Sequence, residues 1–534
     1  MGAVALLLLL LFSQLVTMLK WSWTLGPTAD GDVDVDLSWY PPRNTSINDL
    51  AAVLDDSNGI YGFVFNSSDT PPGVAYGTYN WCNMPHVRKT EYVRPSAEYE
   101  LQYVEVIQRH HKRTPYASNA FPVEPYRWDC PDQGLFYYGQ AISGPDASEP
   151  AAEGYWQGYT SPVNPFTPSG WVGTCQFPQI TLSGLDDVRV HGRDLYEVYH
   201  DLLGFLPSRD DDEWRSRVAY RVTQNVITSQ VAGMLINGMW GATAASAPAP
   251  LLIQAAGIDS LEPQYTCAAG SVLFNAIKSS SSNATWRMHL DQAGDLFRQL
   301  DAISGVDPDD GGFHASFDHY YDNLSARQCH DAKPLPCRPG TDVNSSAACV
   351  DQHLADAVYR MGQWEYSQMY RDAPDSLAAS AASYGVWIAE LGAHLRDRAA
   401  GKAGDNPIIY FHNVAHDGSV SRVLSILQID IMVWPGMGSE IVFELYRKRA
   451  GTEPNRERAD RGATTSTSTG TGTGTSDGGY YVRVLFGGQV LRSSHPSLGV
   501  MDMVPLETLL AYFDGLVGEN ASLIVGKCNG TIPI

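Results

Sequence analysis

A strand and a charged loop follow one another in the stretch that decides the fold, Leu101-Gln102-Tyr103-Val104-Glu105-Val106-Ile107-Gln108 and then Arg109-His110-His111-Lys112-Arg113-Thr114-Pro115. The first part is rich in β-branched and aromatic residues, which predicts a strand over 101–107. The second part begins directly where that strand ends. Ligands of open α/β sheets bind at the carboxyl ends of the strands, so we expect a functional loop over residues 109–115.

A second polar pair, His416-Asp417, follows a predicted strand at 408–411 and precedes a predicted helix at 420–427. The two loops are about 300 residues apart in the chain, but they meet if their strands are neighbours in one sheet. Each loop also has a plainer interpretation. The basic residues at 109–113 can form a solvated patch, and a His-Asp pair after a strand can be a structural turn.

Alternating strands and helices at both ends of the chain predict an α/β core. A long amphipathic helix is expected after Ser376, with Gly401 at its end. Two strands at 440–446 and 480–485 and a helix starting at Pro505 follow. In the middle of the chain, Thr223 is expected to cap a helix that runs to about Gly238.

These patterns divide the chain into the following expected parts: a signal peptide or signal anchor at 1–19, an irregular extension at 20–96, an α/β core at 97–135 and 351–534 that contains a Ser/Thr/Gly-rich loop at 450–479, and a mainly helical inserted cap domain at 136–350. The loop contains a formal G-x-S-x-G match at 474–478. A nucleophile elbow needs a strand before it and a helix after it, so we interpret this match as chance.

The composition predicts a secreted protein. The apolar run Leu6–Leu11 is typical of a signal peptide, although the alternative is a membrane anchor that is not cleaved. Eight cysteines without a C-x-x-C pair favour disulfides over a metal site. Sequons that predict N-glycans occur at Asn44, Asn66, Asn283, Asn323, Asn344, Asn520 and Asn529. A net charge of −23 argues against nucleic acid or an anionic membrane surface as a partner.

The residue types of the two loops indicate phosphate-ester chemistry. Arg109 and Arg113 can neutralise phosphate oxygens with their guanidinium forks, and a neutral His110 can attack phosphorus. Asp417 can donate a proton to the leaving oxygen, and His416 can donate a hydrogen bond to the phosphoryl group. In this arrangement the protein supplies the positive charge, and the residues imply neither a metal nor an organic cofactor.

The pattern Arg109-His110-x-x-Arg113-x-Pro115 resembles the R-H-G-x-R-x-P signature of the histidine acid phosphatases, branch two of the histidine phosphatase superfamily. His416-Asp417 resembles the H-D pair of that family, and the stretches 433–446 and 481–488 resemble the segments that follow it. The similarity spans roughly 97–517, and the sequence resembles fungal secreted members of the family, including phytases. It implies a phosphoglycerate mutase-like three-layer α/β fold, with His110 as the nucleophile that becomes phosphohistidine and Asp417 as the proton donor.

Two departures from the family pattern bear on activity. The glycine that follows the nucleophile is His111 here, and its side chain is expected to narrow or reshape the pocket. The third phosphate-binding arginine of the family aligns with Asn225, which brings no charge; Arg221 is a possible substitute, or else a surface ion-pair partner of residues 210–213. Losing one such donor typically costs on the order of 10²–10³ in rate.

The sequence therefore predicts a secreted acid phosphatase that acts on small phosphate monoesters. With only two arginines, it is expected to prefer singly charged esters over highly phosphorylated ones. The alternative is a secreted, catalytically weak relative that binds anionic or phosphorylated ligands.

Overall fold

The computed structural model describes residues 33–55, 57–64, 70–123, 127–136, 139–142, 151–167, 172–243, 246–279, 281–330, 334–338, 349–401, 407–449 and 479–533. Within these ranges no helix has the length and apolar character needed to cross a membrane. The expected signal peptide, the G-x-S-x-G match, nearly all of the 450–479 loop, and the sequons Asn66 and Asn344 lie outside the described residues.

A mixed β-sheet forms the centre of the molecule. Its strands run in the order β10-β8-β7-β1-β6-β4-β5, and β9 pairs with β8. Strands β1, β6, β4 and β5 are parallel to one another, whereas β7 is antiparallel to both of its neighbours. The strands are β1 Tyr99–Arg109, β4 Val218–Val222, β5 Leu251–Leu252, β6 Tyr410–Ala415, β7 Glu440–Lys448, β8 Tyr480–Phe486, β9 Gln489–Val490 and β10 Val504–Pro505.

Helices cover both faces of this sheet, which makes the core a three-layer α/β structure. Side chains of β1 alternate between the faces: Val104 and Val106 pack in the core cluster that contains α3 and α5, whereas Tyr103 and Ile107 pack in the cluster that contains α11, α12 and α13. These helices are α3 Leu182–Tyr196, α5 Val226–Trp240, α11 Asp375–Ala399, α12 Asp417–Ile426 and α13 Leu506–Val517. The expected fold class is therefore confirmed.

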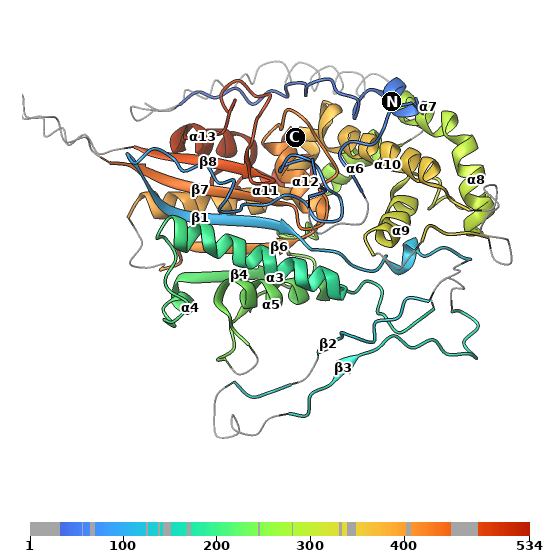
Figure 1. Cartoon of the computed structure of the whole chain (residues 1–534). Coiled ribbons are helices and arrows are strands. Elements are labelled where there is room, and N and C mark those ends of the chain that lie inside the picture. The colour runs from blue at the N-terminus through green and yellow to red at the C-terminus, as the bar shows by residue number, and fades with distance from the viewer. Residues whose placement is uncertain are drawn as a thin grey trace, which may run out of the picture.

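A second group of helices lies beyond the carboxyl end of β1 (Figure 1). It comprises α6 Ala268–Ile277, α7 Ala284–Gln292, α8 Gly294–Ser304, α9 Asp318–Gln328 and α10 Gln352–Ser367. The remaining short elements are α2 Leu50–Leu54, β2 Leu135–Phe136, β3 Tyr155–Trp156, α4 Trp214–Arg217 and α14 Ile524–Cys528. Because α9 and α10 stand at the strand ends, they can supply walls for a site there.

The segment 136–350 differs from the expected separate cap domain. Its strands β4 and β5 belong to the central sheet, where β4 pairs with β6 in parallel. Helix α5 starts two residues later than expected, because Asn225, not Thr223, is its N-cap and its side chain accepts a hydrogen bond from the Ile227 amide. Only the helices after β5 form the group at the strand ends, so part of the expected insertion is integral to the core.

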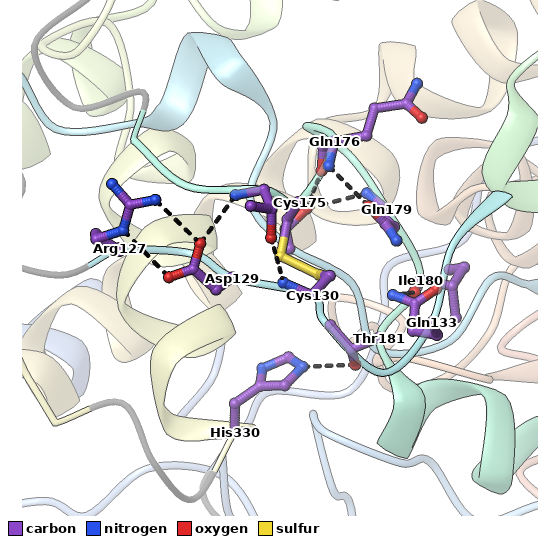
Figure 2. The surroundings of a disulfide bond; sticks show 12 residues. Arg127, Asp129, Cys130, Gln133, Cys175, Gln176, Gln179, Ile180, Thr181 and His330 are labelled. Atoms are coloured by element: carbon purple, nitrogen blue, oxygen red, sulfur yellow. Dashed lines mark hydrogen bonds and ion pairs between the residues drawn. A yellow bond between two sulfur atoms is a disulfide. The ribbon is translucent and has the colours of Figure 1, made fainter. Parts of the chain in front are cut away.

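All eight cysteines are paired, which confirms the expected disulfides. The pairs are Cys82–Cys329, Cys130–Cys175, Cys267–Cys528 and Cys337–Cys349. Figure 2 shows how the Cys130–Cys175 bond sits beside the strip 176–181, whose Gln176 amide donates to Gln179 at 2.7 Å. This strip in turn holds Thr114, which accepts from the Gln179 amide at 3.0 Å and thereby ties the loop after β1 to the disulfide.

The described sequons differ in accessibility. Asn44, Asn520 and Asn529 are exposed, which suits glycosylation. Asn323 is only 1% exposed, and its side-chain amide donates to the carbonyl oxygen of Asn119. The prediction of a glycan at Asn323 therefore does not fit the folded protein, because a buried, hydrogen-bonded amide cannot receive one.

Candidate active site

Neighbouring parallel strands bring the two predicted loops together. In the register of β1 and β6, Arg109 lies opposite Ala415, so that His110 and His416 leave the sheet side by side. The His110 amide donates to the Ala415 carbonyl at 3.0 Å, and the two imidazole rings lie 5.5 Å apart between centroids. The two loops therefore lie next to each other in the fold, as the sequence predicts.

His110 is held as one tautomer. Its Nδ1 lies 3.0 Å from the carbonyl oxygen of His111, which can only accept, so Nδ1 carries the proton and Nε2 keeps its lone pair. Burial lowers the pKa of His110 well below its usual value, and the cations Arg113 and Arg109 lower it further. The imidazole is therefore neutral in mild acid, and its Nε2 atom carries the lone pair.

Arg109 and Asp417 form an ion pair with 3.1 Å between Nη2 and Oδ2. Arg109 is almost fully buried, and its guanidinium also donates to the Pro435 carbonyl and lies over the Trp81 ring. The Asp417 carboxylate accepts from the Trp434 indole at 2.8 Å. Burial by itself raises the pKa of Asp417, but Arg109 and the Trp434 N–H outweigh burial and hold the pKa below its usual value.

Arg113 is buried and also paired with a carboxylate. Its Nη1 lies 2.9 Å from Asp322 on α9, and its guanidinium lies over the Tyr116 ring at 4.2 Å. Arg113 is fixed from two sides, so its position does not depend on a ligand. Any phosphate bound at Arg113 shares that cation with Asp322.

His416 stands at the N-terminus of α12 and hydrogen-bonds to Thr223 with 3.0 Å between Nε2 and Oγ1. Burial, with Arg113 and Arg109 adding to it, lowers the pKa of His416 to about 4, although Asp417 acts in the opposite direction. Glu262 approaches the same ring to 3.7 Å. A neutral His416 can orient a phosphoryl group through a hydrogen bond without repelling the neighbouring cations.

These side chains line one cavity of about 420 Å³ at the carboxyl ends of β1 and β6. Five of the six predicted site residues line it, namely Arg109, His110, Arg113, His416 and Asp417. The other lining residues are Tyr116, Asn119, Glu262, Pro263, Gln264, Asp318, Asp322, Tyr366, Gly418, Ser419, Arg422 and Trp434.

Asn225 is not among the lining residues. Its side-chain amide lies 3.2 Å from the Tyr116 hydroxyl, and its carbonyl group caps α5, so it supports the cavity wall from behind. Arg221 forms buried ion pairs with Asp259 at 3.0 Å and Glu390 at 2.7 Å. Both interpretations of Arg221 are therefore wrong: it neither lines the cavity nor pairs with residues 210–213.

His111 does not narrow the cavity, contrary to the expectation. Its ring is fully buried and points into the core, where its Nε2 lies 3.3 Å from Nδ1 of His191. Gly438 makes room for it: this glycine has a φ of +73°, and an added Cβ would lie 2.6 Å from His111 Nε2. His111 thus acts on the loop's backbone from behind and leaves the cavity open.

Sequence reasoning missed the residues that complete the cavity. Trp434 lies in the stretch 433–446 that resembles the family, but its residue type alone predicts no role, and Asp322, Glu262 and Arg422 belong to no motif. Burial raises the pKa of Glu262, with Asp259 adding to the effect. No cluster of histidine, cysteine and carboxylate groups suited to a metal ion occurs in the ranges that the structure describes.

The site therefore combines an α/β fold with a buried neutral histidine and two arginines in one cavity at the carboxyl ends of the strands. No protein-family model and no curated protein matches the chain. Among solved structures it is similar to the Hafnia alvei phytase in its apo form (13% identity, 80% of this chain and 99% of that chain, TM-score 0.48). It is also similar to the phytase from D. castellii (12%, 89% and 94%, TM-score 0.42) and to the Bifidobacterium longum multiple inositol polyphosphate phosphatase (11%, 78% and 93%, TM-score 0.38).

Proposed function

We propose that the protein is a phosphomonoesterase of the histidine acid phosphatase type, with His110 as nucleophile and Asp417 as proton donor. The observation that carries this proposal is the fixed tautomer of His110, whose Nε2 lone pair is available beside two guanidinium groups. Arg109 and Arg113 bind the phosphoryl oxygens, and His416 donates a hydrogen bond to one of them. A histidine that served only to stabilise the fold would not need two guanidinium groups beside its imidazole.

In the first step the Nε2 lone pair of His110 attacks phosphorus, and the bond between phosphorus and the ester oxygen breaks. The leaving oxygen takes the proton from the Asp417 carboxyl group and departs as a neutral alcohol. The product on the protein is phosphohistidine at His110.

In the second step a water molecule attacks the same phosphorus atom, and the bond between phosphorus and nitrogen breaks. Asp417, now a carboxylate, takes a proton from that water and regains its acid form. Inorganic phosphate leaves, and His110 returns to its neutral tautomer, so that both groups end as they began.

Arg109 pairs with Asp417 and keeps it as a carboxylate, with its pKa below the usual value. An incoming phosphate competes for Arg109 and adds negative charge beside Asp417, and both effects raise the pKa of Asp417. Substrate binding therefore loads the acid with its proton, most readily in acidic solution. Secretion and N-glycosylation remain part of the proposal, and the four disulfides support an oxidising compartment.

The proposal is tested by hydrolysis of p-nitrophenyl phosphate between pH 3 and 8, without added metal, by the wild-type protein and by His110→Ala. We expect acid-pH activity that disappears in the variant. A radiolabelled phosphate ester should also leave an acid-labile, alkali-stable phosphoryl label on the wild-type protein and none on His110→Ala. A folded wild-type protein without hydrolysis would instead indicate the anion-binding relative.

A further inference from the structure

Arg422 brings a third guanidinium group to the cavity, and neither the motifs nor the proposed mechanism uses it. It lies on α12, five residues after Asp417, and its side chain is half-buried in the cavity wall. Sequence reasoning, with Asn225 in place of the third arginine, expected two cations in the cavity and offered only Arg221 as a substitute for the third. The structure supplies another one at a different position.

The side chain of Arg422 is fixed by neighbours that are not acidic. Its Nε donates to the Ser383 hydroxyl at 3.0 Å, and its Nη1 donates to the Gly418 carbonyl at 2.8 Å. The guanidinium also lies over the ring of Phe274 at 4.9 Å and that of Tyr370 at 5.5 Å. These contacts hold the plane of the group while leaving its charge uncompensated.

The three arginines of the cavity differ in their pairing. Arg109 pairs with Asp417 and Arg113 pairs with Asp322, whereas Arg422 has no carboxylate within 4 Å among the described residues. An immobilised, half-buried guanidinium without a counter-ion binds an anion more favourably than one that must first release a carboxylate. Of these three arginines, Arg422 is thus the one best prepared to bind a negatively charged ligand.

The location of Arg422 relates it to the leaving group. Its Nη1 is bound to the carbonyl of Gly418, the residue next to Asp417, on the same first turns of α12. Asp417 is the group that protonates the leaving oxygen in the proposed mechanism, so Arg422 lies on the side of the cavity from which the alcohol departs. Arg109 and Arg113 serve the phosphoryl group that is transferred.

We infer that Arg422 forms a second anion subsite, which selects phosphate esters whose alcohol carries another anionic group, a phosphate or a carboxylate. This inference rests on the proposed function for the orientation of the ester. It replaces the sequence-based expectation that singly charged esters are preferred. The second anion also fixes the direction in which the substrate lies, with its leaving oxygen toward Asp417.

The test compares propane-1,3-diol monophosphate with the bisphosphate, which differ only in the second anion, and uses 3-phosphoglycerate as the carboxylate case. The ratio of kcat/KM for the bisphosphate to that for the monophosphate is measured in wild type, Arg422→Gln and Arg422→Lys. A charged hydrogen-bonded contact predicts that Arg422→Gln lowers this ratio about tenfold to a hundredfold, with Arg422→Lys in between. A similar loss of kcat/KM with 3-phosphoglycerate shows that the subsite accepts a carboxylate as well as a phosphate, and no loss with this ester shows that it accepts phosphate only.

Arg396→Gln is the matched control, because Arg396 lies on α11 in a partly exposed ion pair with Asp514 and does not line the cavity. It changes the net charge equally and should leave the ratio as in wild type. If Arg422→Gln does not fold, Ser383→Ala removes one anchor of the guanidinium and should lower the same ratio severalfold.

A binding measurement separates the subsite from catalysis. Calorimetry with inositol hexakissulfate, a non-hydrolysable polyanion, and with inorganic sulfate gives the affinity ratio in wild type and Arg422→Gln. A wild-type protein that hydrolyses no ester refutes the proposed function. Even then, a smaller preference for inositol hexakissulfate over sulfate in Arg422→Gln than in wild type supports the subsite. Equal ratios in wild type and Arg422→Gln, in binding and in kinetics, would overturn the inference.

Discussion

Nδ1 of His110 donates its hydrogen bond to the main-chain carbonyl of His111, the residue that replaces the glycine expected at that place. The His111 ring anchors this carbonyl from the core side. It does so through a chain of hydrogen bonds in which each group donates to the next, from Gln108 through His111 and His191 to Glu440. His191 donates to Glu440 at 2.9 Å, so its Nδ1 accepts from His111; Gln108 then donates to His111 at 3.2 Å. Every ring in this chain must be neutral, because an additional proton would place two donors face to face.

Replacing His111 tests this anchoring. His111→Gly should lower kcat for p-nitrophenyl phosphate by roughly 10-fold or more with a smaller change in KM, because the nucleophile loses orientation while the arginines stay in place. Glutamine can both donate and accept, so His111→Gln should recover part of the loss. Equal kcat values for wild type and His111→Gly, at equal thermal stability, would show that the glycine suffices.

Asp417→Asn should slow esters in proportion to how poor their leaving group is. Without an acid, an alkoxide must leave unprotonated, so turnover of glycerol 2-phosphate should fall roughly 10²–10⁴-fold. p-Nitrophenolate leaves without help, and its release should fall much less. Steady-state kinetics with both esters decides the matter, and a common factor for the two would argue against Asp417 as the proton donor.

Trp434→Phe should move the alkaline limb of the kcat profile to higher pH. The variant removes the indole N–H that stabilises the Asp417 carboxylate at 2.8 Å, and so the pKa of Asp417 rises. The stacked Tyr366 ring, 4.0 Å away, still has an aromatic partner. The kcat of both proteins is measured from pH 3 to 8, and a limb at the same pH in both would contradict this role.

The acid limb of kcat/KM should lie well below pH 6.5. His110 attacks as the neutral base, and burial together with Arg113 and Arg109 lowers its pKa well below the ordinary value. His110 is then already deprotonated in mild acid, and raising the pH through 6.5 provides no more nucleophile. Activity that increases through pH 6.5 would show that His110 titrates normally.

Stability should decrease as the pH falls below 6.5, because several buried histidines are held neutral. Burial lowers the pKa of His111 and His191, and lowers that of His412 to about 3. On acidification the unfolded chain takes up protons near pH 6.5 and the native state does not. Each such histidine therefore lowers the free energy of unfolding by up to about 1.4 kcal/mol per pH unit. The stabilisation is complete above pH 6.5 and is lost on the acid side.

Urea unfolding at pH 7 and pH 5 measures this loss, and His412→Gln should reduce the difference between the two free energies of unfolding. His394 provides the opposite case: despite burial, Glu105 raises its pKa, so its contribution is complete below pH 6.5 and decreases above its folded-state pKa. A wild-type protein equally stable at both pH values would contradict the prediction.

The sequence by itself determined those features that depend on neighbouring residues. The β-branched run of β1, the charged residues that follow it, and the His416-Asp417 pair after β6 are local signals, and the structure places all of them around one cavity. Helix α11 was predicted from the helical spacing of its apolar residues, and strands β7 and β8 were predicted as well. The carboxyl ends of the strands followed as the place of the site.

Only the tertiary structure decided which distant residues complete that site. Asp322 reaches Arg113 from α9, Trp434 reaches Asp417, and Arg422 points back along α12 into the cavity, and none of these contacts belongs to a local pattern. The membership of β4 in the central sheet likewise depends on its pairing with β6, nearly 200 residues away. Local composition sets which element a segment forms, but the pairing of elements and the charges that meet between them follow from packing of the whole chain.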